Sequence, residues 1–160
     1  MIDQATDLAV RKSVTVEAPQ ERAFAVFTDM SAWWLVDSHH IGEQVPEAVV
    51  IEPHAGGRWF ERAPDGVECD WGRVIEWRPP SRILLGWHLN QEWKFDPNPE
   101  TATEIEVRFI SLGPTTTRVE LEHRCFERLG DAAAAVSEAV GSPEGWSGLL
   151  SQYAEAASQA

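Results

Sequence analysis

The stretch SPEGWSGLLSQYAEAA, residues 142–157, decides how the rest of this chain must fold. Its apolar residues follow the spacing i, i+3, i+4, i+7 and i+11, which forms one stripe on a helix: Trp146, Leu149, Leu150, Tyr153 and Ala157. Ser142 is a good N-cap, and Pro143 suits the first helical position. The pattern predicts one long helix over 142–157. Its aromatic stripe needs a broad apolar surface to pack on.

The preceding chain supplies that surface as a predicted antiparallel sheet. Between 103 and 111, for example, Ile105, Val107 and Phe109 alternate with charged residues, as in a strand with one buried face. Short turns between successive strands indicate an antiparallel meander with one charged and one apolar face. Strands are expected at 8–18, 48–52, 58–62, 69–77, 82–89, 103–111 and 117–124. Short helices are expected at 19–28 and 30–35, with one or two helical turns within 130–141.

Length and composition favour one globular domain over residues 1–160, with a frayed start at 1–7. Apolar residues make up 43% of the chain, which is enough for a substantial core. No apolar run is long enough for a transmembrane helix, and the N-terminus lacks the pattern of a signal peptide. We therefore expect a cytoplasmic protein.

The net charge and the absence of known motifs exclude several classes of function. The net charge of −13 argues against nucleic acid or an anionic membrane surface as a partner. The sequence has no Walker-type loop, dinucleotide fingerprint or nucleophile elbow, so we predict no cofactor and assign no catalytic residue. His39 and His40 are adjacent in a predicted loop, but no further ligands are spaced to join them. We therefore predict no metal site.

Eight tryptophans in 160 residues suggest an aromatic-lined cavity between the sheet and the last helix. Six of them are expected to form its wall: Trp33, Trp34, Trp59, Trp71, Trp87 and Trp146. Trp77, near a strand end, and Trp93, in a long loop, are left open. Strand alternation also turns Glu61 and His123 inward, whereas the direction of Arg73 stays undecided.

Several strings of the sequence, in this order, look familiar. They are VEAPQERAFAVFTD at 16–29, WW at 33–34, EPHAGGRWFE at 52–61, WGRVIEWRPPSRILLGW at 71–87, TEIEVRF at 103–109, TRVELEH at 117–123 and GWSGLL at 145–150. Together they span nearly the whole chain. The chain resembles the family named for activators of the heat-shock protein 90 ATPase, within the START-like or Bet v 1-like (SRPBCC) superfamily.

This resemblance implies an α+β helix-grip fold. In that fold, a curved antiparallel sheet of about seven strands wraps around the C-terminal helix and leaves a cavity. The superfamily includes lipid carriers, binders of hormones and secondary metabolites, polyketide cyclases and chaperone activators. Binding of a small hydrophobic or aromatic molecule is the function we expect first, which makes a non-enzymatic role the default.

Two alternatives remain open. One is a chaperone co-factor or stress-response protein, with a chaperone as its partner. The other is a polyketide-cyclase-like enzyme that would use His123 and Glu61. The chain is expected to be a monomer or a homodimer. The residues expected to contact a ligand are Trp33, Trp34, Trp59, Glu61, Trp71, Trp87, Phe109, His123, Trp146, Leu150 and Tyr153.

Overall fold

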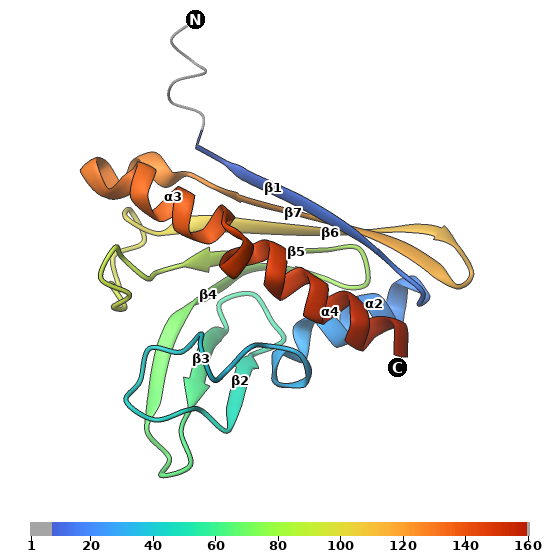
Figure 1. Ribbon diagram of the computed structural model, residues 1–160, viewed down its shortest axis with the longest axis horizontal. Coiled ribbons are helices and arrows are strands. Elements are labelled where there is room, and N and C mark those ends of the chain that lie inside the picture. The colour runs from blue at the N-terminus through green and yellow to red at the C-terminus, as the bar shows by residue number, and fades with distance from the viewer. Residues whose placement is uncertain (1–7, 160) are drawn as a thin grey trace, which may run out of the picture.

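A computed structural model describes residues 8–159 of the chain. The predicted order of elements is confirmed (Figure 1). The strands are β1 (Val10–Val16), β2 (Ala48–Ile51), β3 (Arg58–Arg62), β4 (Glu68–Arg78), β5 (Arg82–Trp87), β6 (Thr103–Gly113) and β7 (Thr116–Arg124). The helices are α2 (Gln20–Thr28), α3 (Ala133–Gly141) and α4 (Gly148–Gln159), with shorter turns η1 (Met30–Ala32), η2 (Phe126–Ala132) and η3 (Pro143–Ser147).

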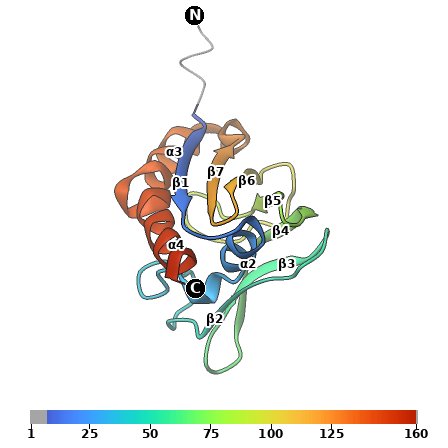
Figure 2. The same cartoon turned by 90° about the vertical axis from the view of Figure 1, so that its right-hand side faces the viewer.

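The seven strands form one antiparallel sheet in the order β1-β7-β6-β5-β4-β3-β2. Five successive hairpins build the run from β2 to β7, and β1 then closes against β7. The sheet curls from β1 to β2 around α2, while α4 lies across its open side (Figure 2). The predicted helix-grip fold is therefore confirmed.

The apolar stripe of the last helix is buried as predicted, and Tyr153 has no exposed surface. Its hydroxyl donates a hydrogen bond to the carbonyl oxygen of Ala23 at 2.7 Å, which joins α4 to α2. The ring of Phe27 lies 5.1 Å from the Tyr153 ring and 5.7 Å from the Phe109 ring, measured between centroids. These edge-to-face contacts connect both helices to the apolar face of β6.

The prediction of one helix over 142–157 is wrong in its first turn. Residues Pro143–Ser147 form a π-helical turn with a break at Gly145 (φ −95°, ψ −130°), and α4 begins only at Gly148. The break brings the backbone so close that a Cβ on residue 145 would lie 2.2 Å from the carbonyl oxygen of Val140. Only glycine fits there. The turn therefore places Trp146 at a corner between α3 and α4.

Other boundaries also differ from the sequence pattern. The first strand covers only Val10–Val16, the second short helix is the single turn η1, and the Ala-rich segment forms the nine-residue helix α3. In β4 the pairing register shifts between Val74 and Glu76, so simple alternation fails there. Arg73, left open by the sequence, holds its guanidinium 5.1 Å from the centroid of the Phe95 ring.

The charged face of the sheet is confirmed as well. Glu106 receives one hydrogen bond from Arg82 at 2.6 Å and another from Arg124 at 2.7 Å. Within residues 8–159 no helix is long and apolar enough to cross a membrane.

Tyr153→Phe tests the connection between α4 and α2. The substitution removes one buried hydrogen bond and keeps the ring, so we expect the free energy of unfolding to fall by about 1 kcal/mol. Urea denaturation measures this difference. Gln152→Ala, on the exposed side of the same helix, serves as the control and should change stability by less than about 0.5 kcal/mol. Equal stability of Tyr153→Phe and the parent would contradict the assignment.

Candidate functional site

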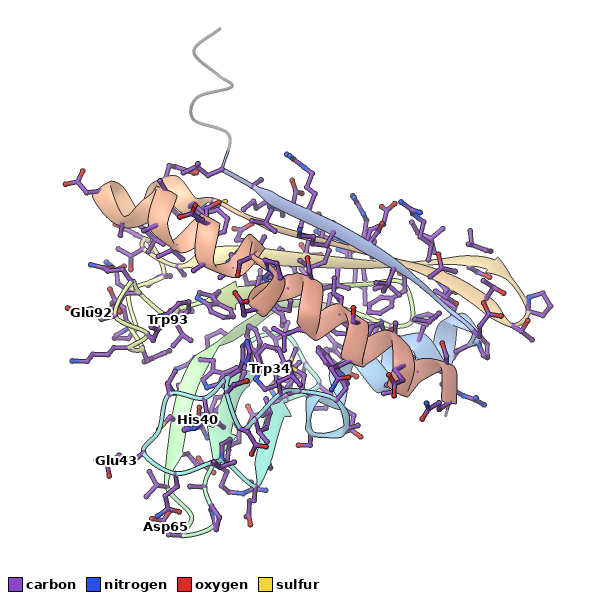
Figure 3. All side chains as sticks on the ribbon, viewed as in Figure 1. Trp34, His40, Glu43, Asp65, Glu92 and Trp93 are labelled. Carbon is purple, nitrogen blue, oxygen red and sulfur yellow. The ribbon has the colours of Figure 1, made fainter. Side chains whose placement is uncertain are left out.

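A cavity of about 550 Å³ opens between one end of the sheet, the α3–α4 corner and two connecting segments. One segment leads from η1 to β2 and carries Trp34 and His40, and the other joins β5 to β6 and carries Trp93 (Figure 3). The cavity is lined by Trp34, Ser38, His39, His40, Ile41, Trp71, Trp87, Leu89, Trp93, Ala139, Val140, Ser142, Glu144, Gly145, Trp146 and Leu149.

Five indole rings make up much of this lining. Trp34 lies 5.1 Å from Trp71 and 6.0 Å from Trp146, between ring centroids. Trp87 lies 6.3 Å from Trp146 and 6.4 Å from Trp93, both edge to face. The rings therefore contact one another in a continuous series around the cavity. Flat apolar faces of this kind suit a flat apolar guest.

The indole N–H groups differ in their availability. Trp34 donates to the carbonyl oxygen of His39 at 2.9 Å. Trp71 donates to the carboxylate of Glu61 at 2.9 Å, and Trp146 donates to the imidazole of His123 at 3.1 Å. These three hydrogen bonds fix the orientation of their rings. The N–H of Trp87, in contrast, is buried without a partner.

Glu61 holds the η1–β2 segment from behind the wall. Its side chain is only 1% exposed. Besides the indole of Trp71, its carboxylate accepts hydrogen bonds from the backbone N–H groups of Ile41 at 2.7 Å and Gly42 at 3.0 Å. Three donors thus satisfy the buried acceptor oxygens. The carboxylate therefore positions the part of the segment that carries His40.

His123 is fully buried behind Trp87 and Trp146. Its Nδ1 accepts the Trp146 hydrogen bond, so this nitrogen carries no proton. Its Nε2 then donates to the Thr103 hydroxyl, at 2.8 Å. Burial lowers the pKa of His123 to about 3, which keeps the ring neutral. Both nitrogens are therefore engaged within the protein.

Two histidines do line the cavity. His39 bridges its walls, because its Nε2 lies 2.6 Å from the carbonyl oxygen of Glu144 and its Nδ1 lies 2.7 Å from the hydroxyl of Ser38. The Nδ1 of His40 lies 2.9 Å from the carbonyl oxygen of Gly42. Among residues 8–159 no three His, Cys, Asp or Glu side chains are grouped to hold a metal ion.

Trp93 lies on a tightly held turn at the mouth of the cavity. The Asn90 side chain accepts hydrogen bonds from the backbone N–H groups of Glu92 at 2.9 Å and Lys94 at 3.1 Å. Within this turn Trp93 adopts φ +60°, a left-handed conformation that bulky residues rarely take. The ring nevertheless remains 44% exposed. The turn therefore presents a large aromatic surface that a guest could cover.

The structure divides the predicted ligand-contacting residues into two groups. Four of them line the cavity: Trp34, Trp71, Trp87 and Trp146. The other seven lie in the core outside this lining: Trp33, Trp59, Glu61, Phe109, His123, Leu150 and Tyr153. The alternation of side chains along a strand identifies the inner face of the sheet. It does not show which end of that face borders the cavity. That difference depends on where the helices and loops cover it.

Sequence reasoning did not select His39, His40 or Trp93 as ligand contacts, although all three line the cavity. The adjacent histidines suggest only a pair of metal ligands, and the residues around Trp93 show no periodicity. The signal available was the turn chemistry of Asn90, whose side chain favours capping of a tight turn. Recognising it would have placed Trp93 on an ordered turn rather than in an irregular loop.

The sequence model of the family described as "Activator of Hsp90 ATPase homolog 1-like protein" matches residues 17–157. The chain belongs to this family. The predicted resemblance is therefore confirmed over nearly the whole chain. A search of curated proteins found no match.

Two solved structures share substantial sequence with this family member. An anthrahydroquino-gamma-pyrone synthase, Txn09, is 39% identical, with a TM-score of 0.65 over 92% of this chain and 96% of the other. CalC, a self-sacrificing resistance protein from Micromonospora echinospora, is 30% identical, with a TM-score of 0.70 over 96% of each chain. The Aha1 dimer from Colwellia psychrerythraea is 15% identical, with a TM-score of 0.58 over 94% of both chains, and shows the shared fold alone.

Glu61→Gln tests the anchor of the η1–β2 segment. An amide can accept with only one of its two terminal atoms, so its NH₂ group would face a backbone N–H or the Trp71 indole. We expect a loss of about 1–3 kcal/mol in the free energy of unfolding. We also expect faster amide hydrogen exchange at residues 41 and 42. Glu47→Gln, on an exposed ion pair, is the control. Unchanged exchange at both amides would contradict the role given to Glu61.

His123 predicts a specific pH dependence of stability. Its pKa is about 3 in the folded protein and about 6.5 when unfolded, so the unfolded chain binds the proton more readily as pH falls. The contribution of His123 to the free energy of unfolding is complete above about pH 6.5, and it is lost progressively as the pH falls from there toward 3. Between pH 6.5 and pH 5 this group should remove about 2 kcal/mol.

Chemical denaturation at several pH values measures this decline for the parent and for His123→Gln. The variant is expected to be less stable at neutral pH, because it loses the hydrogen-bond geometry of the imidazole. Its free energy of unfolding should nevertheless fall less steeply below pH 6.5, because residue 123 no longer titrates. Parallel curves for the two proteins would show that His123 does not cause the decline.

Proposed function

We propose that this protein binds a planar polycyclic aromatic molecule in the tryptophan-lined cavity. The observation that carries this proposal is the series of five indole rings around a space of about 550 Å³. Stacked or edge-to-face aromatic contacts favour flat rings over flexible chains or bulky cages. The cavity thus suits the aromatic class of guest better than a fatty acid or a sterol.

One relative supports the same class of ligand. The synthase that is 39% identical to this chain is named for an anthrahydroquinone-derived pyrone, which is a fused aromatic ring system. Its similarity extends over nearly the full length of both chains. Shared fold alone would not indicate a shared ligand, so the aromatic wall of this chain remains the principal argument.

A ring-closing enzyme is the second candidate, favoured by the similarity to that synthase. The polar side chains in the cavity lining are those of Ser38, His39, His40, Ser142 and Glu144. His123 and Glu61 are less suited, because they are buried outside this lining and their polar atoms make hydrogen bonds inside the protein. The chaperone alternative stays a prediction supported by the family name.

Titration of tryptophan fluorescence with anthracene, anthraquinone, cholesterol and palmitate tests the proposed function. We expect saturable quenching by the two planar compounds, and weak or no response to the other two. Binding of cholesterol or palmitate at least as tight as that of the planar compounds would contradict the proposal, as would no saturable response to anthracene and anthraquinone.

Trp93→Ala tests where the ligand lies. The ring is exposed, so its loss should leave the fold intact but remove one aromatic contact, weakening binding of anthracene about fivefold. Calorimetric titration measures the affinity independently of fluorescence. Trp77→Phe is the matched control, because Trp77 packs on Phe24 at 5.1 Å and is not part of the lining. An equal loss in both variants would place the ligand elsewhere.

A further inference from the structure

We propose that Nε2 of His40 accepts a hydrogen bond from a hydroxyl group of the ligand, so that the cavity selects phenolic polycyclic aromatics over their ethers. This inference rests on the proposed function and adds a chemical requirement to it. It depends on the protonation pattern of His40 and on the engagement of the other ring nitrogens around the cavity.

The tautomer of His40 follows from its hydrogen bond. Nδ1 lies 2.9 Å from the carbonyl oxygen of Gly42, which can only accept. Nδ1 must therefore carry the proton. In the neutral ring the lone pair then lies on Nε2, on the edge turned away from Gly42. His40 lines the cavity, and its Nε2 has no hydrogen-bond partner among residues 8–159.

The other ring nitrogens of the cavity lining cannot take the same role. His39 uses Nε2 toward the carbonyl oxygen of Glu144 and Nδ1 toward the hydroxyl of Ser38. The indoles of the wall have N–H groups only, and these donate. Of the ring nitrogens that the described residues place around the cavity, Nε2 of His40 is thus the acceptor without a partner. A hydroxyl group satisfies it, whereas an ether oxygen does not.

The surroundings of His40 hold it in place. Gly42, whose carbonyl oxygen fixes the ring, also donates its N–H to Glu61 at 3.0 Å. A Cβ on residue 42 would lie 2.9 Å from Oε2 of Glu61 and 3.3 Å from Sγ of Cys69, so a side chain there would displace one of these groups. The buried carboxylate therefore positions Gly42, and Gly42 positions the imidazole. An acceptor fixed before the ligand arrives discriminates better than a mobile one.

The experiment compares 2-hydroxyanthracene with 2-methoxyanthracene, which share the same rings and differ in the donor. Calorimetric titration at neutral pH should show that the parent protein prefers the hydroxyl compound about fivefold. His40→Phe should abolish this preference, measured as the ratio of the two affinities within the same variant. His40→Gln should retain part of the preference, because its amide oxygen can accept.

His54→Phe is the matched control, since His54 lies in the exposed β2–β3 turn outside the lining, and it should keep the full preference. Circular dichroism checks that each variant is folded. A preference that persists in folded His40→Phe would overturn the assignment. Equal binding of the two compounds by the parent would overturn the inference but leave the proposed function standing. Failure of the parent to bind either compound would overturn both.

Discussion

The buried hydrogen bond from the Trp146 indole to His123 connects the C-terminal helical segment to the sheet. Trp146 lies in the turn between α3 and α4, and His123 lies in β7. Through its other nitrogen His123 also reaches Thr103 at the start of β6. The imidazole can accept and donate at once only while it is neutral, and complete burial maintains that state. The corner of the helical layer is thus fixed to the sheet by one neutral histidine.

A second buried group fixes the opposite side of the cavity. The buried side chain of Glu61 accepts hydrogen bonds from three donors: the N–H groups of Ile41, Gly42 and Trp71. The segment from η1 to β2 contains no regular secondary structure between residues 37 and 46. The hydrogen bonds to Glu61 therefore fix its backbone in place of the regular hydrogen bonds of a strand or helix. His123 and Glu61 both lie buried behind the residues that line the cavity. They hold the aromatic rings and loops that a ligand would meet.

The resulting cavity combines broad apolar surface with few free polar atoms. Most indole N–H groups of its wall are already engaged, so they contribute shape rather than polar recognition. The buried N–H of Trp87 and the Nε2 of His40 have no partner among the described residues. A pocket of this kind gains affinity from ring burial and orientation from a small number of hydrogen bonds. That division of roles fits an oxygenated, flat aromatic guest better than a flexible lipid.

The sequence by itself determined the order of elements, the apolar face of the sheet and the buried stripe of the last helix. These features follow from local periodicity, and the alternation around Ile105 and the spacing from Trp146 to Ala157 both express it. Sequence strings that span most of the chain also identified the family, and the match over residues 17–157 confirmed it.

Only the tertiary structure decided where the core stops and the cavity begins. Trp59 and Trp87 share the inner face of the sheet, yet only Trp87 meets the open space, because the elements packed around each ring differ. The break at Gly145 was also invisible to periodicity, since it arises from close approach to the carbonyl oxygen of Val140. The same holds for the tautomer of His40, which is set by the carbonyl oxygen of Gly42. Periodicity specifies which face a residue shares, whereas three-dimensional packing specifies what fills the space beside it.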